Sequence, residues 1–116
     1  MRLILSLTVF FLAASVASGQ GRFQPYEIKA GISYYSDEYT AHDGVSVLGE
    51  EKNLEEVYQN YNYYEAVFDS QERIVVFKAY ERGTLEFSEE YYYGEGEEPI
   101  RKIVKNSDGS ESAVDF

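Results

Sequence analysis

The second half of the chain alternates between apolar and polar positions in short runs that turn signals separate. These runs cover residues 61–68, 73–80 and 84–93, a run that Pro99 opens, and a short last run at 110–116. A period of two, with many aromatic and β-branched side chains, is typical of half-buried β-strands. Turn signals recur every 10–13 residues, which leaves no room for crossover helices. The pattern predicts a mainly β protein, an antiparallel β-meander whose single sheet curls because strands twist.

The first half of the chain is less regular. Residues 26–35 alternate well enough to predict a strand, residues 45–48 predict another, and the polar stretch 36–44 between them is turn-like. Asn53 is a residue type that caps helix N-termini, and acidic residues with apolar residues at helical spacing follow it. One short helix is therefore predicted near residues 53–59, packed across a face of the sheet.

The start of the chain has the order of a secretory signal peptide. A positive residue precedes 14 uncharged residues at 3–16, and small residues then mark a cleavage site after Ala17 or after Gly19. A membrane span needs about 20 apolar residues, so this run is too short for a permanent anchor. We expect a helical signal peptide at 1–19 and a single small β-rich domain at 20–116, secreted or periplasmic and without a membrane span.

Within 63–109, aromatic strands alternate with strands that open on a basic or apolar residue, and residues 68–83 and 93–109 repeat this order weakly. The residues of the pattern are Tyr64, Ala66, Phe68, Asp69, Arg73, Ile74, Val75, Gly83, Leu85, Glu90, Tyr91, Tyr93, Asp108 and Gly109. This stretch resembles the hairpin units of YD-repeat (Rhs-type) and MORN-like proteins, and a family of small exported bacterial proteins without an assigned activity. It departs from these repeats at Gln71 and Glu72, where they usually carry glycine before the arginine. The resemblance implies a β-hairpin module and no particular substrate.

Composition and charge exclude several classes of protein. The chain has 10 Lys and Arg against 21 Asp and Glu, a net charge of −11, with no cysteine and one histidine. Without cysteine there is no disulfide scaffold and no thiolate ligand for haem or an iron–sulfur cluster, and one histidine cannot complete a structural zinc site. An acidic surface disfavours nucleic acid, whose phosphates need basic contacts. We therefore expect no cofactor and no nucleic-acid partner.

The sequence offers little catalytic chemistry. His42 lies in a stretch that reads as an exposed loop, and the chain has no Gly-x-Ser-x-Gly motif to supply a nucleophile. The acidic loop 94–98 and the stretch 106–111 are typical of solvated acidic surface, with weak calcium binding as the alternative. We therefore predict no catalytic residue, no enzyme and no dedicated metal site.

Twelve tyrosines are the most unusual feature of the composition, because neighbouring tyrosines place aromatic rings on both faces of a strand. A one-layer meander cannot bury both faces, so we expect an exposed aromatic interaction surface that includes Tyr63, Phe87, Tyr91 and Tyr93. The alternative is that the helix and the curling of the sheet cover these rings.

Together these features favour an exported binding protein that contacts another protein and catalyses nothing. An acidic rim repels anions and steers cationic partners, which suits an immunity or inhibitor role against a basic partner. The other candidate partner is a second copy of the chain, joined through sheet edges into an extracellular or envelope assembly.

Overall fold

The computed structural model describes residues 23, 25 and 27–116. The predicted signal peptide and its two candidate cleavage sites lie outside this part of the chain. The elements of the described part are β1 (Ser33–Ser36), β2 (Tyr39–His42), β3 (Val45–Leu48), α1 (Leu54–Val57), β4 (Asn62–Phe68), β5 (Ile74–Glu81), β6 (Thr84–Tyr93), β7 (Pro99–Asn106) and β8 (Glu111–Asp115).

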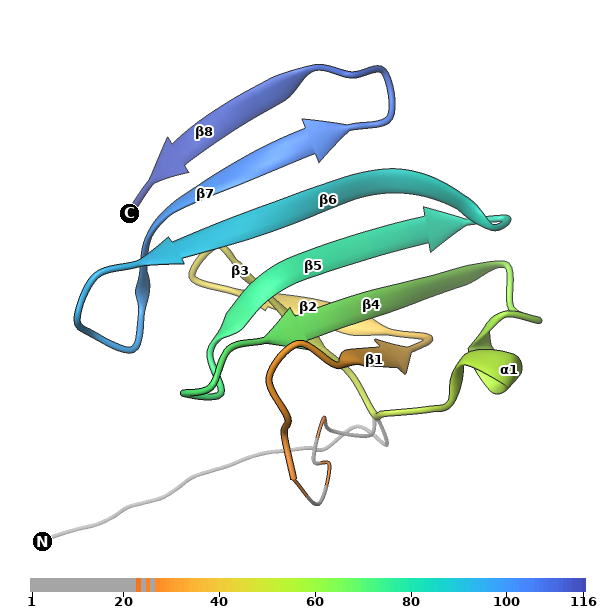
Figure 1. Ribbon diagram of the computed structural model, residues 1–116. Coiled ribbons are helices and arrows are strands. Elements are labelled where there is room, and N and C mark those ends of the chain that lie inside the picture. Colours follow the sequence, from red (N-terminus) through yellow and green to blue (C-terminus); the bar gives the residue numbers. More distant parts are fainter. Residues whose placement is uncertain (1–22, 24, 26) are drawn as a thin grey trace, which may run out of the picture.

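Two antiparallel sheets make up the fold. Six strands form one sheet in the order β1–β4–β5–β6–β7–β8, and β2 and β3 form a separate two-stranded sheet. Strands β4 to β8 follow one another as a meander, and β1 pairs with β4 at one edge. In Figure 1 the large sheet is strongly curled, and the β2–β3 hairpin lies behind its middle strands. The predicted antiparallel, mainly β architecture is confirmed, and the hairpin adds a second layer to the expected single sheet.

The sequence pattern predicts only one strand of the β2–β3 hairpin. Strand β3 begins and ends where it is predicted, at Val45–Leu48. Strand β2 lies in the stretch expected to be turn-like. All four of its residues are exposed, so the sequence there has no alternation of buried and exposed positions that would indicate a strand. Asp43 and Gly44 join the strands with φ angles of 52° and 81°, the left-handed values that tight two-residue hairpin turns require.

Strand β1 is shorter than predicted. The strand expected over residues 26–35 is a strand only at Ser33–Ser36. Just before it, the chain turns at Gly31 with φ of 76°, and the Gly31 N–H donates to the Phe68 carbonyl at 3.0 Å, which interrupts the extended run. Strands β4 to β8, by contrast, match the predicted runs to within two residues at either end.

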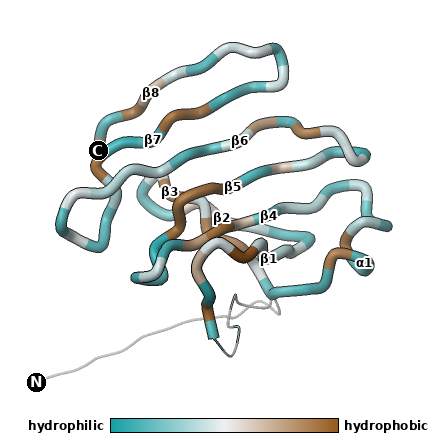
Figure 2. The backbone as a smooth tube through the Cα atoms, viewed as in Figure 1, coloured by the Kyte–Doolittle hydropathy of each residue, from teal (hydrophilic) through white to brown (hydrophobic). Residues whose placement is uncertain are grey.

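The core lies between the hairpin and the face of the six-stranded sheet that the hairpin covers, called here the covered face. Phe77 of β5 is fully buried there, and Leu48 of β3 is almost so. The Tyr39 ring of β2 packs against the rings of Phe77 and Tyr64, with centroids 5.1 and 4.6 Å apart. Burial of one large apolar side chain stabilises a fold by roughly 1.5–3 kcal/mol, so these contacts hold the hairpin on the sheet. Figure 2 shows apolar stretches gathered in this region and hydrophilic loops around it.

The one helix among the described residues confirms the predicted type and start. The Asn53 side chain accepts a hydrogen bond from the Glu56 N–H at 2.8 Å, as an N-cap does. The helix is one turn long, contacts β1 and buries Val57 completely. Just beyond it, the Tyr58 ring lies 6.3 Å from the Tyr63 ring. Tyr63 alternates with Tyr64 along β4 and so points away from the hairpin, onto what we call the opposite face of the large sheet.

The β4–β5 and β7–β8 loops are built alike. The N–H groups of Asp69 and Asn106 each donate to the carbonyl four residues further on, both at 2.9 Å. The residue just before this carbonyl is left-handed in each loop, with φ of 64° at Glu72 and 90° at Gly109. Glycine adopts this conformation freely, whereas a residue with a Cβ is strained in it. Glu72 is thus strained at the position where the resembling repeats carry glycine.

Candidate binding site

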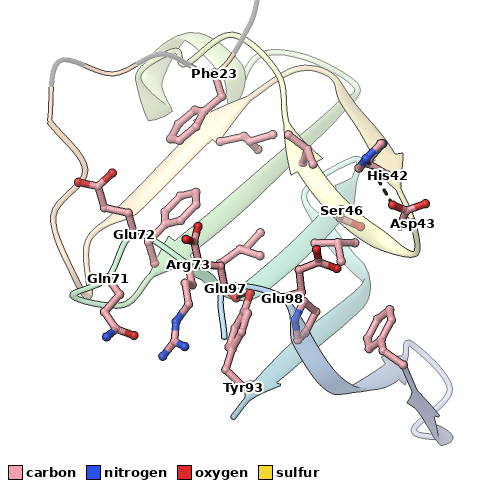
Figure 3. Close-up of a pocket in the computed structure, with 17 residues that line it drawn as sticks. Phe23, His42, Asp43, Ser46, Gln71, Glu72, Arg73, Tyr93, Glu97 and Glu98 are labelled. Atoms are coloured by element: carbon pink, nitrogen blue, oxygen red, sulfur yellow. Dashed lines mark hydrogen bonds and ion pairs between the residues drawn. The ribbon is translucent and has the colours of Figure 1, made fainter. Parts of the chain in front are cut away.

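A hollow of about 560 Å³ lies between the β2–β3 hairpin and one end of the six-stranded sheet. The β2–β3 turn, the β4–β5 loop, the β6–β7 loop and Phe116 bound it, and Figure 3 shows their side chains around the space. Ligand pockets commonly enclose roughly 300–1,000 Å³ and combine an apolar lining with a few polar groups. The hollow has this size and this kind of lining, so it is the candidate site.

Apolar side chains from several strands form the floor of the hollow. They are Val45, Leu48, Phe68, Ile74 and Tyr93. Phe68 and Tyr93 are equivalent: each is the last residue of its strand, and in each case the strand register shifts just before it. The weak sequence repeat therefore has a structural counterpart, because its two equivalent aromatic residues line the same hollow.

Carboxylates dominate the rim of the hollow. Asp43 from the hairpin turn, Glu72 from the β4–β5 loop, and Glu97 and Glu98 from the β6–β7 loop all line it and are all exposed. A cluster of like charges creates a potential that attracts ions of the opposite sign. The rim therefore favours a positively charged group on any ligand that enters.

Arg73 also lines the hollow, but its positive charge is already engaged. Its Nε donates to the Asp69 carboxylate at 2.9 Å, its Nη1 donates to the Gly96 carbonyl at 2.9 Å, and its guanidinium lies 4.4 Å from the centre of the Tyr93 ring. Burial alone would raise the pKa of the Asp69 carboxyl, but the hydrogen bonds from Arg73 and Gln71 outweigh it and lower that pKa below 3.8. Arg73 thus joins the β4–β5 and β6–β7 loops into one wall.

A buried hydrogen-bond network holds the other wall, the hairpin, against β6. The Glu89 carboxylate accepts hydrogen bonds from the hydroxyls of Ser46 and Tyr91 at 2.6 and 2.7 Å. The Lys102 ammonium donates to Glu89 at 3.1 Å and to the Gly44 carbonyl at 2.7 Å. Glu89 is only 6% exposed, and a charge so buried is tolerated when it is paired and hydrogen-bonded. Burial, with a contribution from Glu89, raises the pKa of the Tyr91 hydroxyl.

The hollow gathers the residue types of a catalytic triad without their geometry. His42, Asp43 and Ser46 all line it. The Ser46 hydroxyl donates to Glu89, whereas His42 Nε2 lies 3.4 Å from the Asp43 carboxylate, and both His42 and Asp43 are more than 80% exposed. A triad needs the histidine bonded to the nucleophile on one side and to the acid on the other. Among the described residues no such chain of contacts is formed.

The four aromatic residues expected to share an exposed surface do not lie together. Tyr91 is 4% exposed within the Glu89 network, and Tyr63 is 6% exposed on the opposite face. Phe87 is half-buried, packed against the core, and Tyr93 is half-buried with its hydroxyl donating to the Ile74 carbonyl at 2.6 Å. The expected surface is corrected accordingly, because the hairpin and neighbouring rings cover positions that a single layer would leave open. Of the four, Tyr93 lines the hollow.

The opposite face carries its own aromatic cluster. The Tyr63 and Tyr80 rings stack with centroids 4.7 Å apart. The Glu65 carboxylate accepts hydrogen bonds from the Tyr80 hydroxyl at 2.9 Å and from the Ser33 hydroxyl at 2.6 Å. Burial, with a contribution from Glu65, raises the pKa of Tyr80. The alternative reading of the tyrosines, in which neighbouring elements cover them, therefore describes Tyr63 better than an exposed surface does.

The acidic loops do not assemble a metal centre in the described part of the chain. No three His, Cys, Asp or Glu side chains gather there as ligands of one ion. In the stretch 106–111, the Asp108 carboxylate accepts hydrogen bonds from the Ser110 N–H and hydroxyl at 2.8 and 2.6 Å, which shape the turn. Of the helices in the described residues, none has the length and apolarity to cross a bilayer.

Comparison of the chain with models of protein families, with curated proteins and with solved structures finds no match in any of the three. Function must therefore be argued from the site itself. Sequence reasoning named His42 and the acidic loop 94–98, but it did not bring them together with Val45, Glu72 and Phe116 in one site. For two residues of the floor the sequence carries a signal, because the weak repeat aligns Phe68 with Tyr93.

Proposed function

We propose that this chain is an exported binding protein without catalytic activity, and that it recognises a basic protein partner. The observation that supports the proposal is an excess of exposed carboxylates, part of which surrounds the hollow. Electrostatic complementarity of this kind accelerates association and discriminates against partners of the wrong charge.

Most of the carboxylates are not paired with a lysine or arginine within residues 27–116. All 21 Asp and Glu lie in the part of the chain that the structure describes. Five of them pair with Lys or Arg among the described residues, namely Asp37, Asp69, Glu89, Glu90 and Asp115. These pairs engage Lys52, Arg73, Arg101, Lys102 and Lys105. The surface is thus left strongly negative, because the acids outnumber the bases that could neutralise them.

Assembly through sheet edges is the second candidate, and β8 favours it. This strand is an edge of the large sheet, and all five of its residues are exposed. An open edge offers unpaired N–H and C=O groups to another strand. However, antiparallel pairing of two copies about Ala113 would set Glu111 opposite Asp115 of the second copy, and like charges directly opposite destabilise a strand pair. The edge therefore suits a strand with basic side chains better than a second copy.

Affinity capture tests the proposal. The purified chain is used as bait with the secreted and envelope fractions of the source cells, at low and at high salt, and the captured proteins are identified by mass spectrometry. We expect strongly basic proteins to be enriched at low salt and lost at high salt, because exposed charges are screened. Capture with no bias toward basic proteins would contradict the proposal. A stable oligomer in light scattering, with no captured partner, would favour assembly instead.

A further inference from the structure

We propose that the hollow holds a large apolar side chain from a basic peptide segment, and that the rim carboxylates bind the lysines or arginines that flank this side chain. The inference rests on the proposed function, because it specifies which part of a basic protein partner the chain contacts. It goes further by assigning the contact to one site and to a ligand with two chemically distinct parts.

The apolar part follows from the surface that the fold leaves uncovered. Phe116 and Val47, both at the hollow, are 50% and 42% exposed, and Val45 and Tyr93 beside them are half-buried. Apolar area of this kind gains free energy when a ligand removes it from water. A volume of about 560 Å³ accommodates an aromatic or branched aliphatic side chain with its flanking backbone.

The basic part follows from the charges at the rim. Asp43, Glu72, Glu97 and Glu98 are exposed on three sides of the hollow, and Figure 3 shows Asp43 across the space from Glu72. Arg73 does not neutralise these carboxylates, because its guanidinium is bound to Asp69 and Gly96. A peptide with basic residues on both sides of an apolar one can meet carboxylates on both walls.

The two walls are held in place before any ligand arrives. The Glu89 network fixes the hairpin through Ser46 and Lys102, and Arg73 ties the β4–β5 loop to the β6–β7 loop. A preformed site avoids the entropic cost of ordering loops on binding. The hollow is therefore suited to a short linear segment that inserts one side chain.

Calorimetric titration with four short synthetic peptides separates the two parts of the ligand. The first has a central phenylalanine flanked on each side by two lysines, with both ends capped. In the second, glutamates replace the lysines. In the third, serine replaces the phenylalanine, and in the fourth both changes are combined. We expect only the first peptide to bind measurably at moderate salt, because it alone offers an apolar side chain to the floor and basic side chains to the rim carboxylates.

Two variants place the binding at the hollow. Glu97→Gln with Glu98→Gln removes two rim charges and is expected to weaken the first peptide about fivefold, since exposed charge pairs contribute modestly. Glu50→Gln with Glu51→Gln is the matched control: it makes the same change in net charge at two adjacent exposed residues that do not line the hollow. Val47→Lys puts a positive charge in the lining and is expected to weaken binding about tenfold or more. Thermal melting of each variant confirms that it is folded.

The outcomes distinguish this inference from the proposed function. Equal weakening by the rim variant and by the control variant would overturn the inference, because it would show attraction by the overall charge alone. Equal binding of the first and third peptides would also overturn it, because the apolar floor would then contribute nothing. If either result accompanied capture of basic proteins, the proposed function would stand and the hollow would not be its site. Failure of capture together with failure of every peptide would remove both.

Discussion

Each face of the six-stranded sheet carries a glutamate that is hydrogen-bonded to hydroxyl groups, but the two glutamates differ in how far they are buried. On the covered face, Glu89 accepts hydrogen bonds from one serine and one tyrosine hydroxyl, and on the opposite face Glu65 does the same. Glu89 lies beneath the β2–β3 hairpin and is 6% exposed, whereas Glu65 is only half-buried. A lysine, Lys102, is bonded to Glu89. Covering a carboxylate thus goes together with supplying it a cation, because water no longer solvates the charge.

Two neighbouring lysine–glutamate pairs between β6 and β7 differ in burial in the same way. Lys102 bonds Glu89 on the covered face and Lys105 bonds Glu90 on the opposite face, each at 3.1 Å. The side chains of the first pair are 14% and 8% exposed, and those of the second are 43% and 35% exposed. Equal distances therefore do not imply equal energies. The buried pair supports the hairpin, and the exposed pair is screened by solvent.

The largest expected effect comes from removing Lys102, and removing Lys105 is the matched comparison. Lys102→Met leaves Glu89 buried without a cation and is expected to lower the free energy of unfolding by about 3–5 kcal/mol. Lys105→Met leaves Glu90 with access to water and is expected to cost about 0–1 kcal/mol. Urea unfolding followed by circular dichroism measures both. Similar losses in the two variants would contradict the contrast between the faces.

The pH dependence of stability sharpens the contrast through the tyrosines. Burial raises the pKa of Tyr91 in the folded protein above the ordinary 10.0, so above pH 10 the unfolded chain releases this proton first. The stability that Tyr91 contributes is therefore complete below pH 10 and is lost as pH rises, by up to about 1.4 kcal/mol per pH unit. Tyr91→Phe removes this contribution.

Tyr80 provides the comparison for that experiment. Its pKa is also raised by burial and by Glu65, but its side chain lies on the opposite face and is more exposed than that of Tyr91. Urea unfolding at intervals from pH 8 to pH 11 should therefore show a flatter alkaline decline in both Tyr91→Phe and Tyr80→Phe than in the unchanged protein. A decline in Tyr91→Phe as steep as that of the unchanged protein would mean that the hairpin does not shield Tyr91.

The smallest expected effects come from two loop variants. They test whether backbone strain in the loops contributes to the difference in stability between the two faces. Glu72→Gly relieves a left-handed residue and is expected to stabilise the fold by about 0.5–1 kcal/mol. Gly109→Ala is the matched change in the loop of the same construction and is expected to destabilise by about 1 kcal/mol, because it introduces the strain that Glu72 carries.

Urea unfolding of both loop variants, each also combined with Lys102→Met, checks this prediction. If coverage by the hairpin alone separates the faces, Glu72→Gly should leave the cost of Lys102→Met unchanged, since changes at distant sites add. A loss of the Lys102→Met effect in the Glu72→Gly background would show that loop and hairpin are coupled.

The strands that the sequence predicts well are those whose partners are close in the chain. Strands β4 to β8 are joined by short turns, so alternation and turn residues together specify both the strands and their antiparallel order. Asn53 likewise marks the start of α1 through a local cap. These signals act over a few residues and need no knowledge of the fold.

The elements that the sequence predicts poorly depend on distant contacts. Strand β2 has four exposed residues, and it is held by pairing with β3 and by Tyr39 on the covered face. Tyr63 and Tyr91 have the same local pattern as an exposed aromatic strand, and they are buried because other elements lie over them. Such coverage has no local sequence signal, because it depends on which face the hairpin occupies.

The amino-acid sequence by itself determined the antiparallel meander, its turns, the short capped helix and the negative charge, since each arises from local backbone preference or from composition. Tertiary structure alone decided which face the hairpin covers, which carboxylate acquires a buried lysine, and where apolar and acidic side chains meet around a hollow. The contacts that seat the hairpin join residues more than forty positions apart, such as Ser46 with Glu89. Only packing of the whole chain brings such residues together, because burial of apolar surface drives it without regard to their separation along the sequence.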